Sequence, residues 1–174
     1  EIKTTASVSE FNKDSVTITD VVKYSDLETD REYTLVGWIM TKDGKPLQDK
    51  DGHIIDATIK FTPDKNSGEI EMDFIIPVAL LNKGEFVIFE ELYLDDKLVA
   101  DHKDLDDKDQ TVVFIEIVIE KLDKESLEKL EGVEFTLFDE DGNIIESKLT
   151  NELGEVRFLV PKGRYTVKET KALD

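Results

Sequence analysis

The sequence contains no cysteine, so neither a disulfide bond nor thiol chemistry can contribute to this protein. Secreted domains of this size often carry disulfides, whereas cytosolic proteins usually retain a few thiols. The complete absence of cysteine therefore fits an exported protein that is stabilised by some other means.

Basic residues are scarce relative to acidic ones. The chain has 22 Lys and Arg against 41 Asp and Glu, which gives a formal net charge of −19 over 174 residues. Such a field repels phosphate backbones and anionic lipid head groups, which argues against nucleic acid and membrane surfaces as partners. With 39% hydrophobic residues the composition is still that of a folded, soluble protein.

Long apolar runs and helical periodicity are also missing. No signal peptide, membrane-spanning run or sorting signal is recognisable, so we expect the sequence to be one part of a longer protein. Only residues 126–130 (SLEKL) could form a helical turn, and a loop is the alternative. Fold prediction therefore depends on strand signals alone.

Short segments with period-2 alternation recur along the chain and are separated by Gly, Asn and Asp turns, a pattern typical of β-sandwiches. A strand from Gln110 to Glu120 has no Gly or Pro and joins two such regions stiffly. We predict an all-β protein of two tandem Ig-like or prealbumin-like sandwich domains, residues 1–118 and 119–174. The expected strands are 2–8, 16–24, 32–41, 54–62, 69–76, 86–94, 97–102, 110–122, 133–139, 144–149, 155–160 and 165–170.

Polar side chains occupy apolar faces of several predicted strands. In the first domain they are the hydroxyl of Thr4, the carboxyls of Asp20 and Glu90, the imidazole of His102 and the carboxamide of Gln110. A single such residue is usually a satisfied core group. Five in one domain require mutual partners, because each costs several kcal/mol, ~2–7, if it is buried without one.

The same anomaly recurs in the second domain. Lys121 shares a strand face with Ile117 and Ile119, and Glu169 shares one with Tyr165 and Val167. An inward Lys and an inward Glu in so small a domain indicate a pairing or a reaction.

Thr4, His102 and a carboxylate could form a nucleophilic triad, so a hydrolase is one alternative. The sequence has no Gly-rich elbow or oxyanion-hole signature to support turnover of an outside substrate. A metal site is not expected either, because His53 and His102 lack ligand spacing and the acidic runs do not match a calcium loop. We therefore predict no metal and no cofactor.

Several segments of the first domain resemble the Thr–Gln ester-bond domains (VaFE-type repeats) of Gram-positive surface adhesins. These segments are IKTTAS, ITDVVKYSDL, EYTLVGWIM, ATIKFTP, FVIFEELY and VADHKDLDDKDQTV, which together span roughly residues 2–114. The resemblance implies that Thr4 and Gln110 condense into an internal ester with release of ammonia. It also implies that Asp20, Glu90 and His102 promote that reaction.

The second domain resembles Cna-B (SpaA-like) adhesin modules through IEKLDKESLEKLEGVEFTLFDEDGN and TNELGEVRFLVPKGRYTVKET. The resemblance implies a Lys–Asn or Lys–Asp isopeptide site in which a desolvated Lys121 is the nucleophile and Glu169 is the promoting carboxyl. The family's acceptor lies on a final strand after the ET motif, and we expect the second domain to lack this strand within the present sequence.

The two resemblances imply a structural stalk module of a cell-wall-anchored bacterial adhesin, outside the cell, with single-turnover crosslinking rather than enzymatic activity. Its expected partners are neighbouring stalk domains of the same protein, with a host ligand bound by a tip domain elsewhere, and we expect a monomer. A ligand-binding adhesin module is the main alternative. It would need an exposed aromatic patch, to which Trp38 and Tyr93 could contribute, although core packing explains both residues better.

Overall fold

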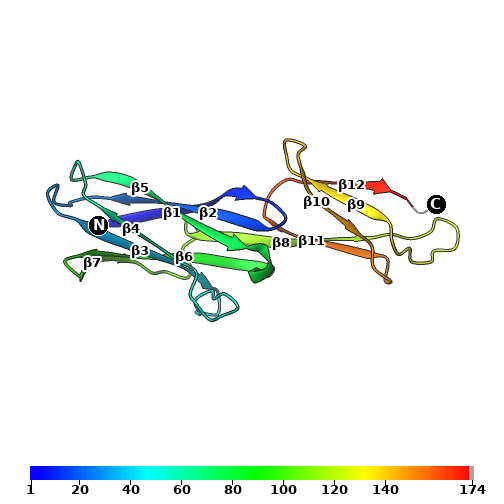
Figure 1. The fold of residues 1–174 in the computed structure, drawn as a ribbon, viewed down its shortest axis with the longest axis horizontal. Helices are drawn as coiled ribbons and strands as arrows, with labels where there is room; N and C mark the ends of the chain where they lie inside the picture. The colour runs from blue at the N-terminus through cyan, green and yellow to red at the C-terminus, as the bar shows by residue number, and fades with distance from the viewer. Residues whose placement is uncertain (173–174) are drawn as a thin grey trace.

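A computed structural model describes residues 1–172 as two β-sandwich units that lie end to end along the long axis of the molecule (Figure 1). The prediction of an all-β fold with two tandem sandwich domains is confirmed. Within the described residues, no helix is long and apolar enough to cross a membrane.

The first unit packs one three-stranded sheet against a larger one. The smaller sheet has the order β1-β2-β5, formed by β1 (Ile2–Phe11), β2 (Ser15–Tyr24) and β5 (Gly68–Pro77). The larger sheet contains β3 (Tyr33–Thr41), β4 (Asp56–Phe61), β6 (Gly84–Leu94), β7 (Lys97–His102) and the start of β8 (Thr111–Glu120). A 3₁₀ turn at Val78–Leu80 links β5 to the segment before β6.

The second unit also uses β8, so the two units share this strand. Residues 111–114 of β8 pair with β6, and residues 114–120 pair with β11 (Glu155–Pro161). The opposing sheet has the order β10-β9-β12, formed by β9 (Glu134–Phe138), β10 (Ile144–Leu149) and β12 (Thr166–Lys171). The change of pairing partner falls at Phe114, while the domain boundary near residue 118 stays a prediction.

Period-2 alternation explains why these segments are strands. In β2, Val16, Ile18, Asp20 and Val22 are buried and the intervening residues are not. Apolar side chains from both sheets then fill the space between them, which removes apolar surface from water. Asp20 lies in this row of buried residues, so the carboxyl has no route to solvent along its own strand.

Two local predictions can be compared with the backbone. Asp95 and Asp96 both have positive φ, at 49° and 59°, as the predicted tight turn between β6 and β7 requires. Residues 126–130 form a loop rather than a helix, with Leu127 at φ 59° and Lys129 in a β-bridge with Leu122. Strand β1 also extends to Phe11, beyond the predicted end at Val8, because a bulge between Val8 and Glu10 restores its pairing with β2.

The two units contact each other around β8. Phe11, at the tip of the β1–β2 hairpin, packs against the core of the second unit, and Leu159 of β11 packs against the core of the first. Lys162 N–H donates to Val113 O at 2.8 Å. The hairpin tip is seen in Figure 1 reaching toward the second unit.

Candidate functional site

Two rows of side chains face each other inside the first unit. In the larger sheet, Gly37 and His102 lie on either side of Glu90 in the register of β3, β6 and β7. In the smaller sheet, Asp20 of β2 lies opposite Met72 of β5. Residues directly opposite each other in adjacent strands present their side chains to the same face. The register therefore places both carboxyls in the space between the sheets.

Asp20 and Glu90 are hydrogen-bonded through their carboxyl groups and are both fully buried. Burial raises the pKa of Glu90 to about 11, and the neighbouring charge of Asp20 acts in the same direction. Burial also raises the pKa of Asp20, although hydrogen bonds from Glu90, Gln110 and the Thr5 backbone oppose the shift. Since two adjacent buried carboxylates cannot both stay charged, the pair holds a proton at neutral pH.

The reacting side chains implied by the sequence both contact this pair. Thr4 Oγ1 donates to Glu90 Oε2 at 3.4 Å, and Gln110 Nε2 donates to Asp20 Oδ1 at 3.2 Å. Thr4 is 6% exposed and Gln110 is 0% exposed. Three buried oxygens, on Asp20, Glu90 and Gln110, have no partner among the described residues if both carboxyls are ionised. A proton held between Asp20 and Glu90 satisfies two of them.

The backbone around Gln110 explains how a residue from a loop reaches the interior. Ala6 N–H in β1 donates to Asp109 O at 2.8 Å, and Ile88 N–H in β6 donates to Gln110 O at 3.1 Å. The segment just before β8 therefore bridges the two sheets. Thr4 and Gln110 approach the carboxyl pair from the first and last strands of the unit.

His102 lies at the outer end of the row, with 24% of its side chain exposed. Its Nε2 is 2.7 Å from Asp107 Oδ2. Partial burial acts to raise the pKa of Asp107, but hydrogen bonds from Asp109 N–H and His102 outweigh it and lower that pKa. Among the described residues, Thr4 donates to Glu90 and not to His102.

Asp107 is the site residue that the sequence analysis missed. It lies in an acidic loop, where strand parity gives no information about which carboxylate faces inward. Its position five residues after His102 and three before Gln110 is the signal available in the sequence. A carboxylate at this position can orient the imidazole through a hydrogen bond.

In the second unit, Lys121 Nζ and Glu169 Oε2 lie 2.7 Å apart. The structure therefore brings together the two residues that the sequence singled out there. Their side chains are 32% and 31% exposed, so Lys121 is partly solvated rather than desolvated as the resemblance implied. The reason is that β8 ends at Glu120 and Lys121 lies just beyond the strand.

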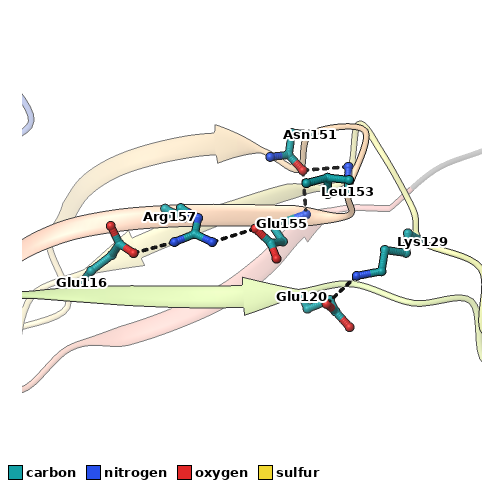
Figure 2. A network of polar contacts seen from close by, with 7 residues as sticks. All are labelled: Glu116, Glu120, Lys129, Asn151, Leu153, Glu155 and Arg157. Atoms are coloured by element: carbon teal, nitrogen blue, oxygen red, sulfur yellow. Dashed lines mark hydrogen bonds and ion pairs between the residues drawn. The ribbon is translucent and has the colours of Figure 1, made fainter.

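The turn that follows β10 fixes the backbone of Lys121. Lys121 N–H donates to Gly154 O at 2.8 Å, and Asn151 Oδ1 accepts from the N–H groups of Leu153 and Glu155. Figure 2 shows this turn together with the ion pairs of the outer face. These pairs join Arg157 to Glu116 and Glu155, and Lys129 to Glu120.

Two other candidate features are explained by local structure. Trp38 packs edge-on against Phe89 at 5.9 Å between ring centroids, and Tyr93 donates to Glu91. Asp49, Asp51 and His53 are the described residues whose ligand atoms lie close enough to hold a metal ion. They occupy one turn, where Asp49 Oδ1 already accepts from the N–H groups of Asp51 and His53.

Comparison with known families now adds to this geometry. Residues 1–114 match the family model of the T-Q ester bond containing domain, which is well over half of the chain. The chain belongs to this family. Residues 115–174 match the model of a prealbumin-like fold domain of the SpaA type. The chain thus combines two modules, and both resemblances stated from its sequence are confirmed. No curated protein sequence matches the chain.

Solved structures with a similar fold include pilins and a bacterial adhesin. Domains D2 and D3 of the major pilin SpaD from Corynebacterium diphtheriae align with a TM-score of 0.60 at 15% identity, over 99% of this chain and 83% of that one. The T6 backbone pilin of Streptococcus pyogenes aligns at 0.55 and 16% identity, over 99% and 48%. An adhesin from Mobiluncus mulieris that contains disulfide, isopeptide and ester cross-links aligns at 0.52 and 17% identity, over 97% and 80%. At these identities the likeness concerns the fold.

Proposed function

We propose that this ester-bond protein is a structural stalk module of a Gram-positive surface adhesin or pilus, and that it crosslinks itself through an ester between Thr4 and Gln110. The single observation that carries the crosslink is the contact of both side chains with one buried, proton-sharing carboxyl pair. Membership of the ester-bond family supports the same reading.

The proposed reaction condenses a hydroxyl with a carboxamide. The Thr4 Oγ–H bond breaks and its proton passes to His102, which Asp107 orients. The new bond joins Thr4 Oγ to Gln110 Cδ, and the pair Asp20–Glu90 stabilises the oxyanion that develops on Gln110 Oε1. The Cδ–Nε2 bond then breaks as His102 returns the proton to the nitrogen, and ammonia leaves. No outside reactant is needed.

Physical proximity supplies much of the rate. Neither an amide nor a hydroxyl reacts readily in neutral water. Holding the two at contact is equivalent to a large effective molarity, about 7–11 kcal/mol of the barrier. Burial of Thr4 and Gln110 then keeps water from the ester.

The mechanical role follows from where the bond lies. Thr4 is in the first strand of the unit and Gln110 directly precedes the last, β8. An ester between them carries tension from β1 into β8 without loading the strands between. Because β8 continues into the second unit, the load passes on through an unbroken strand.

We further propose that Lys121 and Glu169 form an isopeptide-type site in the second unit. Their direct contact at 2.7 Å supports a promoting role for Glu169. An Asn or Asp carried by a strand at the edge of β8 beside Lys121 would complete the site. The module acts between neighbouring stalk domains at the cell surface, and a host ligand is bound by another part of the parent protein.

Intact mass under denaturing conditions tests the ester directly. The wild-type chain should be lighter than its sequence by one ammonia. Thr4→Ala and Gln110→Ala should each restore the full calculated mass. A wild-type chain of full mass would mean that Thr4 and Gln110 are only satisfied core groups.

A further inference from the structure

The two sheets of the first unit approach each other closely beside the Asp20–Glu90 carboxyl pair, where Met72 lies against Gly37. Gly37 lies directly across from Glu90 in the β3–β6 register, and Met72 lies directly across from Asp20 in the β2–β5 register. A Cβ atom added at Gly37 would lie 2.6 Å from Met72 Sδ, closer than real atoms approach. The fully buried Met72 side chain therefore occupies the space beside Glu90 that a side chain at position 37 would take.

Phe74 completes this apolar wall. Its Cζ would lie 2.8 Å from the same added Cβ atom, and the residue is 2% exposed. At the other end of the row, the His102 side chain is 24% exposed. The line of residues Gly37, Glu90 and His102 across β3, β6 and β7 is therefore covered by apolar side chains at Gly37. It is partly exposed to solvent at His102.

We propose that Gly37 and Met72 are positioning residues of the crosslinking site, because on their side of Glu90 they exclude water and any hydrogen-bond donor beyond Thr4 and so keep the carboxyl pair protonated. The inference rests on the proposed condensation of Thr4 with Gln110. Water or a donor beside a carboxylate favours its charged form, whereas an apolar neighbour disfavours it. Gly37 contributes by having no side chain, which leaves space beside Glu90. Met72 fills that space with a thioether, which cannot donate a hydrogen bond.

The polar and titratable groups that face the Glu90 carboxyl come from four segments, namely Thr4 of β1, Asp20 of β2, His102 of β7 and Asp107 of the loop before β8. Strand β3 contributes Gly37 beside Glu90, and strand β5 contributes Met72 and Phe74, which lie against Gly37. The apolar wall formed by Met72 and Phe74 can therefore be substituted without removing a charged group from the surroundings of Glu90.

The test follows ester formation in the full chain as a function of pH. Chains recovered unfolded are diluted into folding buffers from about pH 6 to about pH 11, and loss of ammonia is followed by intact mass. Met72→Gln keeps the length of the side chain but adds donors beside Glu90, and Met72→Leu keeps the wall apolar. Met40→Gln is the matched control, since Met40 is the only other methionine and is buried at 8% exposure in a separate cluster.

We expect the alkaline fall in the rate to move down by about one pH unit or more in Met72→Gln, with about a tenfold lower rate where wild type still reacts fully. Met72→Leu and Met40→Gln should keep the wild-type profile. If Met72→Gln does not fold, as judged by circular dichroism, Met72→Thr replaces it with the same expectation.

The outcomes separate the two proposals. If wild type loses ammonia and the polar variants at position 72 keep its pH profile, the positioning role is overturned and the ester remains. The same holds if Met40→Gln shifts the profile as far as Met72→Gln. A wild-type chain that never loses ammonia overturns the condensation itself, and the positioning role with it.

Discussion

Asp20 and Glu90 share a hydrogen bond between their carboxyl groups, although they belong to different sheets and each is buried within its own strand. Such a contact is repulsive if both groups are ionised and favourable if they hold one proton between them. The fold therefore maintains an acid in its interior at neutral pH. This acid is what distinguishes the interior of the first unit from an ordinary sandwich core.

Loss of the ester should destabilise the first unit strongly. Thr4→Ala removes a crosslink that closes almost the whole domain, and by analogy with disulfides this costs about 4–5 kcal/mol of the free energy of unfolding. Denaturant unfolding of the first unit measures the loss. Thr5→Ala is the matched control, because Thr5 is the exposed neighbour on the opposite face of β1. Equal stability of the two variants would contradict the crosslink.

His102→Ala should slow ester formation by roughly 10²–10⁴-fold and leave the sandwich folded, because a general base contributes about that factor. Asp107→Asn should slow it less, since Asp107 acts through the imidazole. Time-resolved intact mass after dilution from denaturant gives both rates. His53→Ala, at the other histidine, should react as wild type does. Rapid, complete crosslinking in His102→Ala would exclude His102 as the base.

The carboxyl pair should make the uncrosslinked first unit less stable as pH rises. Burial raises the native pKa of Glu90 to about 11, whereas the unfolded carboxyl has a pKa near ~4.3. Between these values the native state binds more protons than the unfolded state, so stability is complete below the unfolded pKa and falls with increasing pH. Urea unfolding of Thr4→Ala from about pH 5 to about pH 9 should reveal this slope, about 1.4 kcal/mol per pH unit at most.

Glu90→Gln added to Thr4→Ala should flatten that slope, because the carboxamide does not titrate. Glu71→Gln, an exposed substitution on β5, is the matched control and should leave the slope intact. A slope that persists in the Glu90 variant would assign the pH dependence to other groups.

Phe11→Ala should loosen the junction between the units. The Phe11 side chain packs against the cores of both units, and its backbone belongs to β1 of the first. Its removal should cost about 1–3 kcal/mol of the stability of the second unit and increase motion between the units. Residual dipolar couplings or small-angle scattering of the crosslinked chain would detect the change. If the two units keep one fixed orientation in the variant, β8 alone determines the stiffness.

Lys121→Ala should cost no more than about 1 kcal/mol, because exposed ion pairs contribute little. Both partners are about one third exposed, and the group beside Lys121 Nζ is a carboxylate rather than an amide. Denaturant unfolding of the second unit tests this expectation. A much larger loss would indicate that Lys121 already takes part in a covalent bond.

The amino-acid sequence by itself determined the fold class, because alternation with period 2 and the turn residues between strands are local properties of the chain. It also identified Thr4, Asp20, Glu90, His102 and Gln110 as inward polar groups, since strand parity decides which face each side chain occupies. Strand parity gives the face on which a side chain lies but not its distance from side chains on other strands. The sequence could therefore identify buried polar groups that need partners, but it could not say which groups contact each other.

Only the tertiary structure decided the pairs, because they arise where two sheets meet. The contact between Asp20 and Glu90, and the place of Met72 in the space above Gly37, depend on how the sheets are stacked, and no single strand encodes that. Asp107 escaped notice because it lies in a loop, where side-chain direction has no period. Lys121 is about one third exposed because its strand ends one residue earlier, a limit set by the pairing with β11.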